Sequence, residues 1–136
     1  MVNDKNIFDL RERIAAACEG LVYTSETDAA VEPFAGAETD AVTAEILLAQ
    51  IGAGTDASVA ESSFEDFFDR SSAEKEWFGA AETARAKKFL ELYKLLEENL
   101  NDRKVFRVGT TRTQIYAVGI DSDGRLTGVQ TNAVET

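Results

Sequence analysis

The chain has 136 residues, a formal net charge of −11 and no histidine. A chain of this length can bury about two thirds of the surface that it exposes when unfolded, so we expect one domain over residues 1–136 that needs no disulfide or metal to fold. The lack of histidine removes the most common general base and metal ligand, and the acidity disfavours nucleic acid as a ligand because it repels phosphate groups.

The first predicted element is a helix over residues 3–20. Apolar side chains recur there at spacings of three and four, at Ile7, Leu10, Ile14 and Cys18. Asn3 or Asp4 can cap its start, and Gly20 suits a left-handed stop. Cys18 lies in the apolar stripe, which predicts a small buried side chain rather than a reactive thiol.

Residues 21–41 predict a short strand and then turns. The run "LVYTSE", residues 21–26, is β-prone, and "TDAAVEPFAGAETDA", residues 27–41, is rich in turn formers and holds the only proline, Pro33.

Two short helices are predicted next. The first, over residues 43–52, starts after Thr43 and ends at Gly52. The second is a helical turn or two over residues 62–72, capped by Ser62 or Ser63, with an inner face of Phe64, Phe67 and Phe68.

The last predicted elements are one long helix and three strands. The helix covers residues 80–104, and its apolar stripe consists of Ala86, Phe89, Leu92, Tyr93, Leu96 and Leu100. Strands are expected over 104–110, 113–121 and 125–135, with the turn "DSDGR" joining the last two as an antiparallel hairpin. This order predicts an α+β fold in which helices pack on a mostly antiparallel sheet.

No catalytic motif accompanies these elements. The chain has no phosphate-binding loop, no dinucleotide glycine fingerprint and no CxxC pair. Serine, cysteine or paired carboxylates need an activating base or a raised pKa in a pocket, and no motif supplies either. We therefore expect no enzyme activity and no cofactor of the chain's own.

The acidity is concentrated in the middle of the chain. From Glu19 to Glu82 there are fifteen Asp or Glu residues against two bases, Arg70 and Lys75. Such a surface favours solubility, and it would also attract a protein that itself binds nucleic acid. The start "MVNDKNIFDL" lacks the features of a signal peptide, and no eighteen consecutive residues are apolar. We expect a cytoplasmic protein that binds no membrane.

Three segments are not explained by folding alone. Glu26 lies in the hydroxyl-rich "TSETD", residues 24–28, and Trp77 lies among acids in "EKEWFG", residues 74–79. The tryptophan is either a hot spot for a basic protein or a plug at the edge of the core. The third segment is the end, "VET", which is either a frayed tail or a set of oxygen ligands held out for a partner.

These segments carry a resemblance to a known family. The sequences "GLVYTSETD", "EKEWFG", "KKFLELYKLLEENLNDRKVFRVG", "IYAVG" and the terminal "VET" resemble, in this order, the cyanobacterial nuclease A inhibitor family. The resemblance covers nearly the whole chain, is most specific from Glu74 onward and is weakest over residues 28–60. It implies a three-layer αβα sandwich similar to the PR-1-like fold.

The resemblance also implies a function and its residues. It implies tight inhibition of a sugar-nonspecific, Mg²⁺-dependent ββα-metal nuclease by a chain that is a monomer when free. It gives Glu26 the place of the scissile phosphate, and it gives the terminus, Glu135 and Thr136, a contact in which Thr136 reaches the nuclease's Mg²⁺. Glu76 and Trp77 form a second contact, although the family pattern has Asp where this chain has Glu76.

Two other functions stay open on the sequence. One is an acidic protein-interaction module of the same fold with a different basic partner. The other is a small hydrolase or ligand carrier, which a deep apolar pocket with convergent polar groups would indicate.

Overall fold

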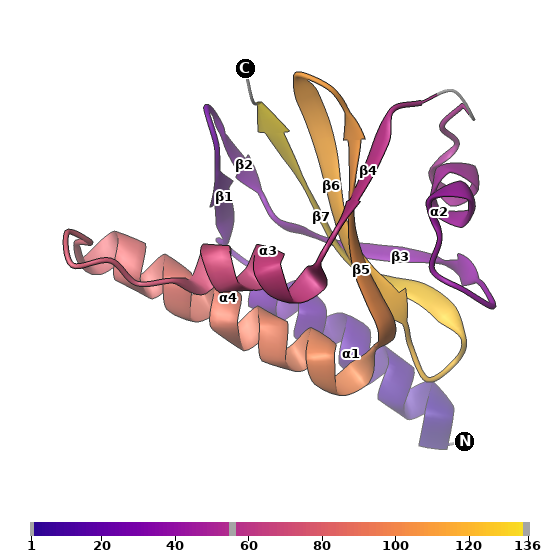
Figure 1. Ribbon diagram of the computed structural model, residues 1–136. Helices are drawn as coiled ribbons and strands as arrows, with labels where there is room; N and C mark the ends of the chain where they lie inside the picture. Colours follow the sequence, from indigo (N-terminus) through magenta and orange to yellow (C-terminus); the bar gives the residue numbers. More distant parts are fainter. Residues whose placement is uncertain (1, 55–56, 135–136) are drawn as a thin grey trace.

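The computed structural model of the protein describes residues 2–54 and 57–134. These residues form the helices α1 (Val2–Cys18), α2 (Ala44–Ile51), α3 (Phe64–Ser72) and α4 (Ala80–Asn99). They also form the strands β1 (Val22–Thr24), β2 (Asp28–Ala30), β3 (Glu32–Glu38), β4 (Val59–Ser62), β5 (Asn101–Gly109), β6 (Arg112–Ile120) and β7 (Arg125–Val134) (Figure 1).

The strands pair only in antiparallel fashion within the described residues. Strands β3, β7, β6, β5 and β4 form one sheet in that spatial order, and β1 pairs with β2 as a separate hairpin. The predicted hairpin between β6 and β7 is confirmed, with Gly124 at a φ of 76°. The buried Asp121 carboxylate holds its turn by accepting hydrogen bonds from the Asp123 and Arg125 N–H groups at 2.9 and 3.1 Å and from the Thr127 hydroxyl at 2.7 Å.

The large sheet buries side chains on both of its faces. On one face, α1, α3 and α4 cover Val105, Ile115, Ala117 and Val129. On the other face, α2 covers Phe106, Tyr116, Val118 and Leu126 (Figure 1). The predicted α+β class is confirmed, and the helices and the sheet lie in three layers.

The short helices begin where the caps predict. The Thr43 hydroxyl accepts a hydrogen bond from Ile46 N–H at 3.2 Å, and α2 ends at Gly52, which has a φ of 74°. Ser63, not Ser62, caps α3 and accepts from Asp66 N–H at 3.1 Å.

The start of α1 differs from the prediction. The helix begins at Val2, ahead of Asn3 and Asp4, so neither of these residues is its cap. Its far end agrees with the pattern, because α1 ends at Cys18 and Gly20 has a φ of 72°.

Other boundaries predicted from the sequence are wrong. Most of the segment 27–41, expected as turns, forms β2 and β3, and β4 is a strand that the pattern did not indicate. Pro33 is compatible with β3 because β3 is an edge strand, bonded only to β7 within the large sheet. The long helix ends at Asn99 rather than at residue 104, since Leu100 already has an extended φ of −120°.

A side chain bonds the backbone carbonyls at the end of α4. Arg103 Nη1 donates hydrogen bonds to the Glu97 and Leu100 carbonyls at 3.1 and 2.6 Å. These bonds satisfy backbone acceptors that a longer helix would have used internally. Leu100 stays in the apolar stripe, 1% exposed, even though it lies just after the helix.

Candidate functional site

Glu26 lies at the apex of the β1–β2 hairpin. Thr24 pairs with Asp28, so the residues between them form the turn. The Ser25 hydroxyl donates a hydrogen bond to the Thr27 carbonyl at 3.0 Å, as does the Ser25 N–H at the same distance. These bonds fix the turn from within and leave the Glu26 side chain exposed.

The Glu26 turn is bonded to the end of β7. Val134 N–H donates a hydrogen bond to the Ser25 hydroxyl at 3.0 Å, and Glu26 N–H donates one to the Val134 carbonyl at 3.2 Å. Figure 1 shows the tip of the hairpin beside the end of β7. Val134 is the last described residue, so the predicted site residues Glu135 and Thr136 lie outside the described part of the chain. The residue before them, Val134, is the one that the structure fixes to the Glu26 turn.

Glu76 and Trp77 form the corner of a second turn, between α3 and α4. The turn is closed by a hydrogen bond from Phe78 N–H to the Lys75 carbonyl at 3.0 Å. Trp77 is 75% exposed, and its ring packs edge-on against Phe78 with the centroids 4.8 Å apart. The alternative that Trp77 plugs the edge of the core is therefore wrong. Glu76 is exposed beside it.

A groove of about 500 Å³ connects this loop to β1. Trp77 and Phe78 line it from the loop, and Tyr23 and Thr24 line it from β1. Arg85, which also lines the groove, joins α4 to β1, because its Nη1 donates a hydrogen bond to the Thr24 hydroxyl at 2.9 Å. The structure thus places Trp77 across a groove from the strand that leads into the Glu26 turn.

Sequence reasoning missed two residues that hold this arrangement. Ser25 links the turn to β7, and its only sequence signal is the hydroxyl-rich run "TSET", which is typical of side chains that bond to nearby backbone. Arg85 had no signal at all, since its partner Thr24 is 61 residues away in sequence.

The single cysteine, Cys18, is not a reactive thiol in this structure. Cys18 is buried, as predicted, and burial raises the pKa of its thiol to about 11, with a smaller contribution from the Glu32 carboxylate. The thiol is therefore protonated at neutral pH. Among the side chains described at residues 10–54 and 57–134, no three acidic or cysteine side chains are grouped so that they could hold a metal ion. None of the described helices is long and apolar enough to cross a membrane.

Comparison with known protein families identifies a relationship over most of the sequence. A family model described as "Nuclease A inhibitor-like protein" matches residues 9–136, which is nearly the whole chain. No protein among the curated sequences matches significantly.

Proposed function

Since the chain belongs to the nuclease A inhibitor-like family, we propose that it inhibits a sugar-nonspecific, Mg²⁺-dependent ββα-metal endonuclease by blocking its active site. Family membership supports a nuclease as the protein partner and a role without enzyme activity of the chain's own. The observation that carries the finer proposal is the bonding of the Glu26 turn to Val134. These bonds hold Val134, the residue that precedes Glu135 and Thr136 in the chain, against the turn that carries Glu26, and this supports a joint role for the two segments to which the family resemblance assigns the inhibitory contacts.

Glu26 takes the place of the scissile phosphate in this proposal. A nuclease holds phosphate with cationic side chains, and a carboxylate offers them charge-assisted, bidentate hydrogen bonds. The backbone bonds that hold the Glu26 turn are already made in the free protein. Binding therefore orders little beyond the side chain itself, which lowers the entropic cost of association.

The terminus supplies oxygen atoms to the metal. Mg²⁺ prefers oxygen ligands, and nucleases keep positions on it that water or substrate fills. We propose that Thr136 occupies one such position and that Glu135 adds to the same contact. The Mg²⁺ would belong to the nuclease and would bridge the two proteins only in the complex.

Glu76 and Trp77 form the second contact in this proposal. Both lie at an exposed turn on the far side of the groove from β1. An exposed tryptophan beside a carboxylate suits a surface where an aromatic anchor packs and an arginine pairs with the acid.

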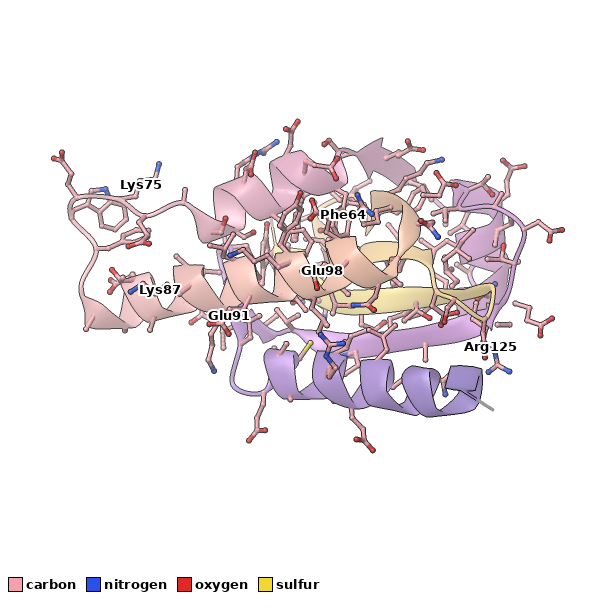
Figure 2. The ribbon with its side chains drawn as sticks, turned by 90° about the horizontal axis from the view of Figure 1, so that it is seen from below. Phe64, Lys75, Lys87, Glu91, Glu98 and Arg125 are labelled. Atoms are coloured by element: carbon pink, nitrogen blue, oxygen red, sulfur yellow. The ribbon has the colours of Figure 1, made fainter. Side chains whose placement is uncertain are left out.

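The proposal is tested by titrating a purified ββα-metal endonuclease with the wild-type chain and with two matched variants. Activity should fall to zero at one chain per nuclease. Glu26→Gln should weaken binding by about 2 kcal/mol or more, whereas Glu98→Gln should change it little. Both variants lose one negative charge, but Glu98 lies on α4, away from Lys75 and the α3–α4 loop (Figure 2).

The salt dependence gives a second readout of the same pair. Association should slow as salt rises for the wild type and for both variants, because the central acids steer the encounter. Equal loss of affinity in Glu26→Gln and Glu98→Gln would mean that only bulk charge matters and would refute the role of Glu26.

Deletion of Thr136 should weaken binding only when the metal is present. Coordination displaces water that Mg²⁺ releases reluctantly, so the expected loss is modest, about 1 to 3 kcal/mol. Binding, rather than activity, is measured by calorimetry in Mg²⁺ and again in EDTA. Thr136→Ser should retain most of the affinity, and Thr136→Val should lose it if the hydroxyl is the ligand. A deletion that costs as much in EDTA as in Mg²⁺ would refute the metal contact.

A further inference from the structure

The groove beside Trp77 gathers the few bases of an acidic region. Between Glu19 and Glu82 the chain has fifteen acids and only two bases, Arg70 and Lys75, and both of these bases line the groove. Arg85 lines it as a third cation, against a single lining acid, Glu82. The lining of the groove therefore carries three cations and one acid, although the segment from Glu19 to Glu82 is strongly acidic in sequence.

The floor of the groove is apolar. Phe89, which is 3% exposed, and the buried Ala86 lie at its base, and Tyr23 and Phe78 form half-buried walls. A second hollow of about 300 Å³ adjoins it through Tyr23 and Arg70. The space suits one or two side chains of a partner, of which one is apolar and one can reach the cations.

The cations stand on elements that the fold holds in place. Arg85 is bonded to Thr24 across the groove at 2.9 Å. The Lys75 carbonyl closes the turn that carries Trp77, and Figure 2 shows Lys75 on this loop, at the opposite end of the molecule from Arg125. The groove thus exists before any partner binds, which favours recognition by a preformed surface.

We propose that this groove receives a segment of the partner nuclease in which an aspartate or glutamate lies next to an apolar residue. Arg70 and Lys75 would pair with the carboxylate, and the apolar side chain would pack on Phe78 and Phe89 beneath Trp77. This inference rests on the proposed function and adds to it. Glu26 and Glu76 meet cationic side chains of the nuclease, whereas the groove between them meets an anionic one.

Contacts of both charge signs can fix the orientation of the complex, which an acidic surface alone cannot do. A purely acidic face would bind a basic cleft in many orientations, because attraction at long range has little directional preference. One contact of opposite sign beside the others fixes the register, since a rotated complex would place like charges together. A partner protein is favoured over a small molecule because the groove is open at Trp77, which is 75% exposed and extends the contact surface.

The test compares Arg70→Gln/Lys75→Gln with the control Lys87→Gln/Lys94→Gln. Each double variant removes two positive charges, and the control pair lies on α4 outside the groove lining. Bulk electrostatics predicts that both double variants bind a basic nuclease as well as or better than the wild type, because both become more negative. The proposal predicts the opposite for the groove pair, a loss of about tenfold in affinity, with the control within about twofold of the wild type.

Both variants are measured by calorimetry against the ββα-metal endonuclease that the wild-type chain inhibits, after their melting temperatures are compared. Unchanged or tighter binding by the groove variant would overturn the inference while leaving the proposed function intact, because the wild-type arm reports that function separately. A wild-type chain that inhibits no such nuclease would refute both. A third outcome would assign the groove to a small anion and would also overturn the inference. In that case inorganic phosphate would raise the melting temperature of the wild type but not of the groove variant, and the two proteins would bind the nuclease with equal affinity.

Discussion

Replacing Phe68 by alanine should lower the free energy of unfolding by about 3 to 5 kcal/mol. The side chain is 1% exposed, and its ring centroid lies 4.8 Å from that of Phe64, 5.2 Å from that of Phe67 and 5.6 Å from that of Tyr93. These rings come from two helices, α3 and α4, so they cannot all move into the space that truncation leaves. Urea unfolding measures the loss as a lower midpoint at an unchanged slope.

The matched control for this prediction is Leu90→Ala. Leu90 lies on α4, whereas Phe68 lies on α3. Leu90 is 40% exposed, so its truncation should cost less than about 1 kcal/mol. A loss for Phe68→Ala no larger than that of Leu90→Ala would contradict the aromatic packing between α3 and α4.

The elements that the sequence predicted well are those whose ends are set locally. Thr43 and Ser63 cap helices a few residues away from the groups they bond, and Gly52 ends α2 through its own left-handed conformation. Such signals lie within one turn of chain and can be read without knowing the fold.

Strand β3 could not be predicted because its order comes from remote residues. Its pairing partner is β7, about which the local sequence holds no information, and Pro33 suggests a break. The Gln50 side chain of α2 also bonds the Ala37 backbone, accepting from its N–H at 2.8 Å and donating to its carbonyl at 3.4 Å. The segment becomes a strand because the sheet edge and α2 enclose it, in spite of its own turn-forming composition.

The candidate site shows the same division between local and remote information. A loop position for Glu26 and exposure of Glu76 follow from neighbouring residues, and both are seen in the structure. The bond between Ser25 and Val134 spans 109 residues, so the proximity of the Glu26 turn to the end of β7 emerges only from the fold. The scarcity of bases between Glu19 and Glu82 was visible in the sequence, but only the structure shows that Arg70 and Lys75 line one groove.

The exposure of Trp77 in the free protein favours its role as a contact for a partner. A large aromatic ring in water is unfavourable, at roughly 25 cal/mol for each Å² of apolar surface, so a ring that is 75% exposed gains free energy when a partner covers it. Its edge-on contact with Phe78 and its place in the Lys75–Phe78 turn restrict the ring before binding. Less side-chain entropy is therefore lost when the complex forms.

Trp77→Ala should raise the dissociation constant for the nuclease by about 30-fold or more, equivalent to about 2 kcal/mol. The melting temperature should change by no more than about 3 °C, because the side chain makes little contact with the core. Trp77→Phe should lose less affinity, since it keeps an aromatic ring over Phe78. Calorimetry and a thermal melt on the same samples separate the two effects.

Leu90→Ala serves as the control here as well. Among the side chains described at residues 10–54 and 57–134, the large apolar ones that are exposed are Leu90 and Trp77, and Leu90 does not line the groove. Its truncation should leave nuclease affinity unchanged. A loss of affinity seen only in Trp77→Ala would then come from the position of the ring and not from the removal of exposed apolar surface in general. A large drop in the melting temperature of Trp77→Ala would show that the ring supports the loop or the core, and the loss of affinity would then be indirect. Unchanged affinity at an unchanged melting temperature would remove Trp77 from the interface, and the contact between the α3–α4 loop and the nuclease would have to rest on Glu76 and the groove cations.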